Sequence, residues 1–356
     1  MTFVGLDLHK RYITACAVDA AGAVLGEVHR MPMTVECLSD FLAALPVPVT
    51  IAMEATLYWA WLTDRLERAG YTVRVANAYQ VKLIWQARSK TDPIDAHKLA
   101  ELARANLLPT VWLPDVATRE RRRLLRGRAF FVRERTKVKN RIHGHLTAEN
   151  QLCPKTDLYG KAGRAWLATV DLSPALRNQV ERLLHLHDYL TQEIKRLDGQ
   201  VKHAAREDPI AKQLETIPGV GTFAALFLHA DIGPVSRFRS SHELAAYAGL
   251  VPTTRSSGGK TTHGTVGNCS NHWLKWILCE VVITLKRSPG PVGLHYRHLL
   301  RAKGKPKATT AAARKFCCYL YWMLKEGWTY DEWLKQHQEV FRRSEVRPSQ
   351  RLGAVA

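Results

Sequence analysis

The sequence predicts an α/β domain at the N-terminus, followed by a mostly α-helical remainder. In the first ~105 residues, β-rich runs alternate with helical spacing in the order βββαβαβα. Cationic residues then dominate one long helical segment, and most of residues 210–335 show helical spacing again. The chain has 356 residues, which is enough for two or three domains.

The individual elements have clear limits in the sequence. We expect strands at 2–8, 12–18 and 23–29, a helix over 34–45, a strand at 49–53, a helix over 58–69, a strand at 71–76 and a helix over 78–87. A long cationic helix covers 119–141, and a second long helix covers 175–205 before Pro209 ends it. A Gly/Ser/Thr-rich segment at 252–268 interrupts the last helical part, which we expect to end near residue 335.

Charge and composition limit the class of partner. The chain contains 52 Lys and Arg against 32 Asp and Glu, a formal net charge of +20, which predicts a polyanionic partner. The longest apolar stretches, 222–232 and 276–285, contain charged residues and are shorter than the ~20 residues of a membrane-spanning helix. The N-terminus has no features of a signal peptide, so we expect a cytoplasmic protein with no membrane partner. Seven cysteines without a Cys-x-x-Cys pair indicate neither a disulfide framework nor a thiolate zinc site.

Four acidic residues occur where a strand or a helix begins or ends. Asp7 interrupts an apolar strand, Glu54 ends the next buried strand, and Asp92 and Asp95 lie three apart in the first turn of a helix, on one face. Each alone has a structural explanation as a strand-end acid, a surface residue or an N-cap. Together they predict a cluster at one sheet edge. Carboxylate oxygens select hard cations, Mg²⁺ or Mn²⁺, in sites that promote phosphoryl transfer.

Three motifs carry these acids, and they resemble a known family. Gly-Leu-Asp-Leu-His-Lys at 5–10, Met-Glu-Ala-Thr at 53–56 and Lys-Thr-Asp-Pro-Ile-Asp-Ala at 90–96 are similar to the RuvC-like DEDD domain of the IS110/IS1111 family of transposases. The resemblance implies an RNase H-like fold for the first domain. It also implies that Asp7, Glu54, Asp92 and Asp95 are catalytic residues that bind the metal ion.

The second half contains a glycine turn between two helical runs, at 214–225. Gly219 and Gly221 permit unusual backbone angles, and the free N–H groups that begin the second helix can face a phosphate. This pattern is typical of a helix-hairpin-helix that binds the nucleic-acid backbone, and an ordinary helix–turn–helix corner is the alternative.

A serine-containing segment extends the resemblance. Ala-Gly-Leu-Val-Pro at 248–252 and Ser-Ser-Gly-Gly-Lys at 256–260 are similar to the transposase domain of the same family, in which a serine is the nucleophile. We favour Ser257, the serine directly before glycine, and Ser256 remains the alternative. Arg255 and Lys260 are placed to hold the phosphate.

The basic helix is expected to hold RNA or DNA backbone, unless it is a solvated charged helix. The expected contact residues are Arg119, Arg121, Arg122, Arg126, Arg133, Lys137 and Arg141.

The resemblance covers about residues 3–330 and implies four segments. These are a RuvC-like DEDD catalytic domain at 1–110, a basic helical or coiled-coil linker at 111–208, a transposase domain with the helix-hairpin-helix and the serine loop at 209–335, and a mobile basic tail at 336–356.

The implied function is that of a DNA transposase or recombinase that moves an insertion sequence. Its expected partners are donor and target DNA, a structured bridge RNA and further copies of the chain, in a dimer or tetramer at the nucleoid. A RuvC-like structure-specific nuclease and a non-catalytic nucleic-acid-binding protein are the alternatives. A covalent protein–DNA adduct distinguishes the transposase from the nuclease, and metal-dependent cleavage distinguishes both from a binding protein.

Overall fold

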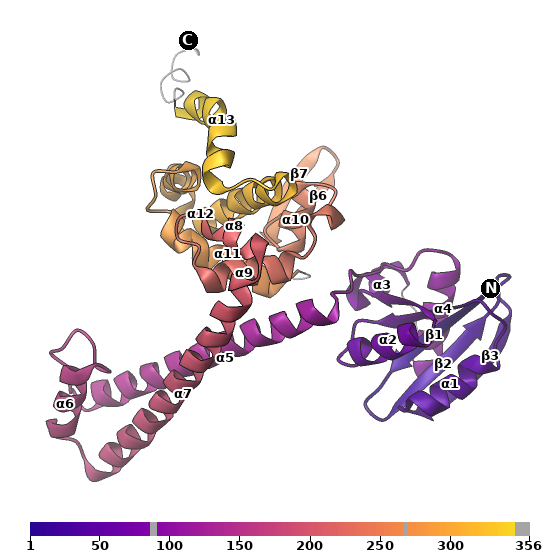
Figure 1. Cartoon of the computed structure of the whole chain (residues 1–356), viewed down its shortest axis with the longest axis horizontal. Coiled ribbons are helices and arrows are strands. Elements are labelled where there is room, and N and C mark those ends of the chain that lie inside the picture. Colours follow the sequence, from indigo (N-terminus) through magenta and orange to yellow (C-terminus); the bar gives the residue numbers. More distant parts are fainter. Residues whose placement is uncertain (86–90, 267–269, 346–356) are drawn as a thin grey trace. The chain divides into compact units, whose positions relative to one another are not determined.

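The computed structural model describes residues 1–85, 91–266 and 270–345. The chain divides into two compact units, an N-terminal unit, Met1–Leu113, and a C-terminal unit, Pro114–Ala356 (Figure 1). Among the described residues, every helix is too short or too polar to cross a membrane.

The N-terminal unit is built on a five-stranded mixed sheet. Its strands are β1 (Thr2–Leu8), β2 (Tyr12–Val18), β3 (Val24–Pro32), β4 (Val49–Glu54) and β5 (Thr72–Ala76), in the spatial order β3-β2-β1-β4-β5. β1, β2 and β3 form an antiparallel meander, whereas β4 lies parallel to β1, and β5 parallel to β4. The predicted mixed α/β architecture is confirmed, and the main difference at the strands is that β3 continues to Pro32.

Helices cover both faces of this sheet. α1 (Val35–Ala43) and α2 (Trp59–Arg68) pack on one face, where Leu38 and Leu62 join a core with Leu6 and Ile51. α4 (Asp92–Arg104) packs on the other face, and the short α3 (Ala78–Ile84) precedes it in the chain. The predicted helix over 78–87 is too long, because α3 ends at Ile84 and Trp85 has an extended backbone; residues 86–87 lie outside the described part.

Gly5 explains how closely α4 approaches the sheet. A Cβ atom on Gly5 would lie 1.9 Å from the carbonyl oxygen of Ala96 and 2.6 Å from the amide nitrogen of Ala100, so no residue with a side chain fits here. The glycine therefore lets the first turns of α4 lie directly against β1.

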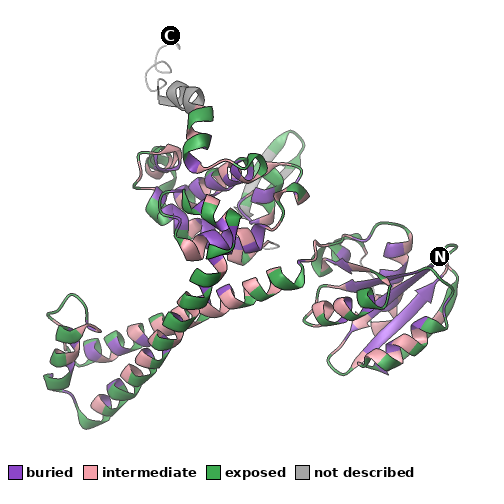
Figure 2. Cartoon of the chain, viewed as in Figure 1, coloured by how far each residue is buried: buried purple, intermediate pink, exposed green. Residues whose placement is uncertain are grey.

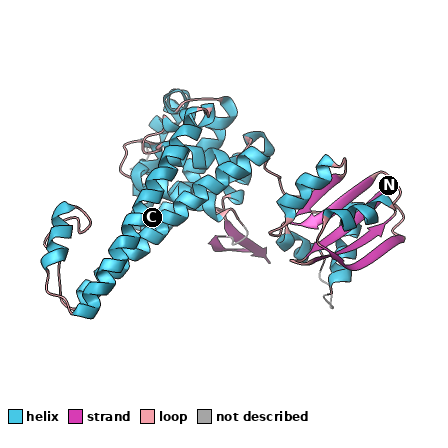
Figure 3. Cartoon of the chain, turned by 60° about the horizontal axis from the view of Figure 1, so that its bottom comes forward, coloured by secondary structure: helices cyan, strands magenta, loops and turns pink. Residues whose placement is uncertain are grey.

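The C-terminal unit is mostly helical, as predicted. Its long helices α5 (Val116–Ala148) and α7 (Pro174–Arg206) lie side by side, with α6 (Lys161–Thr169) between them in the chain (Figures 1 and 3). The remaining helices are α8 (Pro209–Glu215), α9 (Thr222–Ile232), the short 3-10 helix η1 (Val235–Arg237), α10 (Ser241–Tyr247), α11 (His272–Leu285), α12 (Pro291–Glu326) and α13 (Tyr330–Glu345). Figure 2 shows that buried residues gather among α8 to α12, whereas α5 and α7 carry mainly exposed and half-buried residues.

Two segments of the C-terminal unit differ from the prediction. The Gly/Ser/Thr-rich segment forms a β-hairpin of β6 (Pro252–Ser257) and β7 (Lys260–Val266), rather than a loop (Figure 3). Gly258 and Gly259 connect the strands with φ angles of 56° and 77°, the positive values that a two-residue hairpin turn requires. α13 continues to Glu345, past the boundary predicted at 336, and the rest of the predicted tail lies outside the described residues.

Candidate functional site

The sheet brings Asp7 and Glu54 to neighbouring positions. β1 and β4 run parallel, and Leu6 is paired with Met53, so Asp7 and Glu54 follow at the next position on each strand. Side chains alternate along a strand, and both acids therefore belong to the face that carries Gly5 and Ala52. This is the face that α4 covers, so Asp92 and Asp95, in the first turn of α4, lie on the same face of the sheet as Asp7 and Glu54.

His9 links two of the carboxylates directly. Its Nε2 atom lies 2.9 Å from Oδ2 of Asp7 and 3.4 Å from Oδ1 of Asp92. The Tyr12 hydroxyl donates a hydrogen bond of 3.1 Å to Oδ2 of Asp92, and its ring stacks on His9 with centroids 4.5 Å apart. One donor atom from each of Asp7, His9 and Asp92 lies within 4.8 Å of the other two. Asp7, His9 and Asp92 therefore form a compact group. We use the name carboxylate site for these three residues together with Glu54 and Asp95.

The electrostatics of this site favour a cation. Burial raises the pKa of Asp7, and the charges of Asp92 and Asp95 raise it further, against the opposing effect of His9. The buried ammonium of Lys98 lies 3.7 Å from Oδ1 of Asp95 and offsets part of the negative charge. Most donors here are carboxylate oxygens, so the residues fit a hard divalent cation such as Mg²⁺ or Mn²⁺.

Sequence reasoning placed the acids but missed their neighbours. His9 stands two residues after Asp7, a spacing typical of one face of an extended chain, and this signal was present in the sequence. Lys98 stands three residues after Asp95 on a helix, which also predicts contact. Thr91, rather than Asp92, occupies the N-cap position of α4, so the simple capping explanation does not hold for Asp92.

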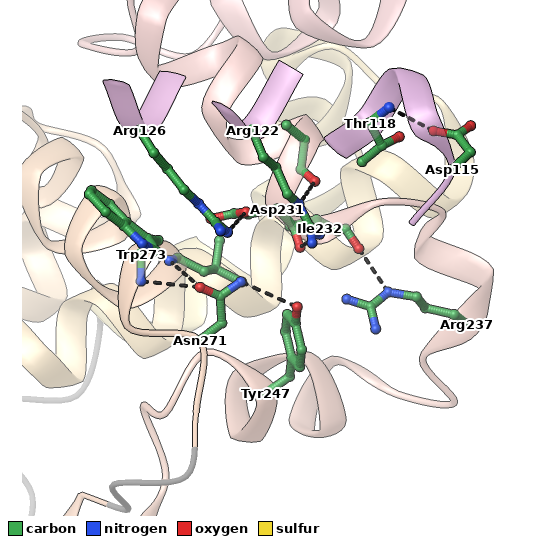
Figure 4. Close-up of polar contacts among 12 residues, drawn as sticks. Asp115, Thr118, Arg122, Arg126, Asp231, Ile232, Arg237, Tyr247, Asn271 and Trp273 are labelled. Carbon is green, nitrogen blue, oxygen red and sulfur yellow. Dashed lines mark hydrogen bonds and ion pairs between the residues drawn. The ribbon is translucent and has the colours of Figure 1, made fainter. Parts of the chain in front are cut away.

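Three of the arginines predicted to bind nucleic acid have acidic partners within the C-terminal unit. Arg122 and Arg126 lie 3.1 Å and 2.8 Å from Oδ1 of Asp231, a fully buried residue of α9 (Figure 4). Arg122 also donates to the backbone carbonyl oxygen of Ala230, at 2.8 Å. Arg121 lies 3.1 Å from Oδ2 of the buried Asp208. These three cations therefore attach α5 to the helices that follow it.

The remaining predicted cations of α5 differ in exposure. Arg133, Lys137 and Arg141 are exposed and lie farther along the helix. Lys137 pairs with Glu134 on the surface at 2.7 Å, and the Arg133 guanidinium lies over the Trp273 ring at 5.4 Å. The half-buried Arg119 donates to the carbonyl oxygen of Pro114 at 3.1 Å. A nucleic-acid strand can therefore reach Arg133, Lys137 and Arg141 without displacing a buried partner.

The Arg122–Asp231 contact yields a stability prediction. We expect Arg122→Met to lower the free energy of unfolding by about 3 kcal/mol, because it leaves the buried Asp231 carboxylate with less compensation. Arg123→Met is the matched control, since Arg123 is exposed and pairs with the exposed Glu120, and it should cost less than about 1 kcal/mol. Urea denaturation measures both values, and equal decreases would contradict the assigned role of Arg122.

The predicted glycine turn joins α8 to α9. Gly219 has a φ of 81°, and a Cβ atom there would lie 2.6 Å from Cγ2 of Thr284 on α11, so glycine is required for both conformation and packing. Gly221 is the N-cap of α9 and faces open space. Lys202, Arg206 and Lys212 line a cavity of about 380 Å³ with Thr222, the first residue of α9. These three cations were not singled out in the sequence.

The β-hairpin presents both candidate serines to solvent. Ser256 and Ser257 are exposed at the end of β6. Ser257 is paired with Lys260 across the turn, so their side chains emerge on the same face of the hairpin. The side chain of Arg255 lies outside the described structure. Ser257 and the carboxylate site belong to different units of the chain.

Comparison with known proteins gives two family matches, one in the first half of the chain and one in the second. A profile for DEDD transposases of the IS110 family, described as "Transposase", matches residues 4–150, and one described as "Transposase IS116/IS110/IS902 family" matches residues 211–297. The first match contains all four acids of the carboxylate site, and the second contains the glycine turn and both serines.

Individual relatives extend this similarity over most of the chain. The transposase of insertion sequence element IS1328 from Yersinia enterocolitica is 30% identical, over 74% of this chain and 77% of its own length. A probable family 20 transposase from Pseudomonas aeruginosa is also 30% identical, over 77% of this chain and 81% of its own length. The transposase of element IS1111A from Coxiella burnetii is 26% identical, over 92% of this chain and 90% of its own length. The chain therefore belongs to the IS110 family of insertion-sequence transposases and is a DNA transposase.

Proposed function

We propose that this transposase cuts and rejoins DNA through a phosphoserine intermediate, with Ser257 as the nucleophile and Mg²⁺ or Mn²⁺ at the carboxylate site. The observation that carries the proposal is the meeting of Asp7, His9 and Asp92 at the end of β1, next to Glu54 and Asp95. The strand order β3-β2-β1-β4-β5, with α4 packed on β1, supports a RuvC-like fold for this unit.

Each residue of the carboxylate site has a role in this proposal. Asp7, Glu54, Asp92 and Asp95 supply the oxygen ligands, and a bound Mg²⁺ would stabilise negative charge on the phosphate oxygens during displacement. His9 orients Asp7 and Asp92 through its ring nitrogen, and Lys98 holds Asp95. These neighbours limit the rotation of the acids before the substrate arrives.

Attack by Ser257 on a DNA phosphate exchanges one phosphodiester bond for another. The Ser257 hydroxyl loses its proton and its oxygen forms a bond to phosphorus, while the bond from phosphorus to one deoxyribose oxygen breaks and that oxygen leaves as a hydroxyl. A hydroxyl of the partner strand then attacks the phosphoserine, which releases Ser257 and joins the strands. Lys260, on the same face as Ser257, is placed to hold the phosphate oxygens. Because one ester replaces another at each step, no high-energy cofactor is needed.

Two groups of cations, one on α5 and one around the N-terminus of α9, supply the nucleic-acid contacts in this proposal. Arg133, Lys137 and Arg141 of α5 bind the backbone of DNA or of a structured bridge RNA that selects donor and target. Lys202, Arg206 and Lys212, around the N-terminus of α9, support backbone binding by the helix-hairpin-helix. The net charge of +20 favours binding of polyanionic partners such as DNA and RNA.

We expect the exposed part of α5 to determine the salt dependence of binding. Replacing Arg133, Lys137 and Arg141 together with Ala should flatten the slope of log K against log salt by about 0.7–0.9 for each phosphate that the variant no longer neutralises. The matched control replaces Arg65, Arg68 and Arg196 with Ala, which removes the same charge from other exposed positions. Fluorescence anisotropy over a salt series measures both slopes, and equal slopes for the two variants would argue against a specific role for α5.

A trapped-substrate experiment tests the proposed chemistry. The protein is incubated with nicked donor DNA in the presence of Mg²⁺, and a covalent protein–DNA adduct is measured by denaturing electrophoresis and by mass spectrometry of the serine peptide. Cleavage without an adduct would favour a RuvC-like nuclease. Absence of metal-dependent cleavage would favour a non-catalytic binding protein. Sequencing of co-purified RNA tests the bridge-RNA partner separately.

A further inference from the structure

A second cavity in the C-terminal unit lies outside the carboxylate site, the glycine turn and the serine hairpin. It has a volume of about 540 Å³ and is lined by residues of α10, α12 and α13. Its size is within the range of small-molecule sites in proteins. α12 has a kink at Gly304, whose φ of 71° is not helical. The kink divides α12 into a first half that ends at Lys303 and a second half that contains Arg314 and Lys315. Because of this bend, residues from both halves of α12 line the same cavity.

The lining of this cavity is cationic. Lys303, Arg314 and Lys315 contribute charged groups, and His242, His295 and His337 contribute imidazoles. None of the described residues that line the cavity is acidic. Arg314 contacts the imidazole of His242, with Nη2 3.3 Å from Nδ1, rather than a carboxylate. Positive charge therefore gathers here without a lining acid to balance it.

The pKa of His295 reflects the same imbalance. Burial lowers it, and the nearby charges of Lys315, His298 and Lys303 lower it further. An anion in the cavity would offset this repulsion. The cavity thus has the electrostatic character of a phosphate site.

Three aromatic side chains, those of Tyr319, Trp322 and Trp333, also line the cavity. Trp322 is 40% exposed, and the Lys325 ammonium lies 5.1 Å from its ring. Tyr319 and Trp333 pack together with ring centroids 4.3 Å apart. Trp322 is the exposed ring of the three, and an exposed aromatic ring beside cations is typical of sites on which nucleobases stack.

We propose that this cavity binds one nucleotide of a single-stranded nucleic acid, with its phosphate at Lys303, Arg314 and Lys315 and its base stacked on Trp322. The inference rests on the proposed function only in that a nucleic-acid strand is the partner, and it uses neither the carboxylate site nor Ser257. RNA and DNA strands share the chemistry that the cavity recognises, so the experiment compares them.

Binding of fluorescent tetranucleotides to the full-length protein tests the base contact. Trp322→Ala should weaken binding by roughly tenfold, within the range found for removal of one base–aromatic stack, and Trp322→Phe should retain most of the affinity. A bromouracil base in the probe should cross-link on irradiation to the peptide that contains residue 322. Since Trp322 is partly exposed, both variants should keep the thermal stability of the parent, which thermal denaturation checks.

A matched pair of charge variants tests the phosphate contact. Lys303→Ala with Lys315→Ala should weaken tetranucleotide binding several-fold. Lys305→Ala with Lys307→Ala should have little effect, because these exposed lysines lie on the same helix outside the cavity lining. Equal effects of the two pairs, or unchanged binding by Trp322→Ala, would overturn the proposal.

The choice of probe identifies the strand. Tighter binding of RNA supports a nucleotide of a guide RNA, and tighter binding of DNA supports a strand of the substrate. All measurements are repeated with Asp7→Asn protein, whose carboxylate site is impaired. If the Asp7→Asn protein still binds the tetranucleotides and the parent protein forms no adduct, the phosphoserine mechanism fails and the nucleotide-binding cavity stands. If the parent protein forms the adduct and the cavity variants bind as well as the parent, the cavity proposal fails alone.

Discussion

Asp7→Asn is expected to lower DNA cleavage and strand transfer by at least about 10³-fold while nucleic-acid binding stays nearly unchanged. Asp7 lies at the centre of the carboxylate site, with His9 2.9 Å away and both Asp92 and Asp95 close enough to raise its pKa. A catalytic cation contributes several kcal/mol to transition-state stability, and each 1.36 kcal/mol corresponds to a tenfold change in rate. Binding depends on cations elsewhere in the chain and should persist.

The control for this variant is Asp40→Asn. Asp40 is an exposed carboxylate on α1, across the sheet from the carboxylate site, and its replacement makes the same change in charge. Initial rates with DNA measure activity, and titration with Mn²⁺ measures metal affinity, which should fall only for Asp7→Asn. Full activity in any two of the single Asn or Gln variants of Asp7, Glu54, Asp92 and Asp95 would contradict a shared metal site.

The architecture of the N-terminal unit could be predicted because each element carries a local signal. Apolar runs of strand length alternate with helical spacing, and glycine at residue 70 ends a helix where expected. Asp7 and Glu54 stood out because each is a charged residue at an otherwise apolar strand end. Parallel pairing of β1 with β4 then places them together, and the helix between β3 and β4 provides the crossover that a parallel strand needs.

The roles of Arg121, Arg122 and Arg126 could not be predicted in the same way. Their partners Asp208 and Asp231 are more than eighty residues away in the sequence, so only the packing of α5 on the later helices brings them together. One indication was present, since Asp231 interrupts an apolar run and a buried carboxylate requires a cation. The sequence does not identify which cation supplies it.

The β-hairpin was missed for a different physical reason. Strands are recognised by alternation between a buried and an exposed face, but most described residues of β6 and β7 are exposed, so apolar residues do not alternate along them. The remaining signal is the Gly-Gly pair, which fits a two-residue turn between strands. Recognition of this turn would have predicted that Ser257 and Lys260 face each other.

Ser257→Ala is expected to abolish the covalent protein–DNA adduct and strand transfer, because alanine has no oxygen to form a bond to phosphorus. Ser256→Ala is the matched control, since Ser256 is the neighbouring exposed serine on the same strand. Denaturing electrophoresis with trapped DNA measures the adduct. An adduct that persists in Ser257→Ala and disappears in Ser256→Ala would reassign the nucleophile to Ser256.

The same variants test how many chains build one active site. Because Asp7 and Ser257 lie in different units, we expect that, in a dimer or tetramer, a serine from one protomer acts with the carboxylate site of another. Mixing Asp7→Asn protein with Ser257→Ala protein, each inactive alone, should restore the adduct once subunits exchange. In such an assembly neither half cuts without its partner, which prevents unpaired cleavage. If mixed oligomers form and no adduct returns, each chain must supply both its own serine and its own carboxylates.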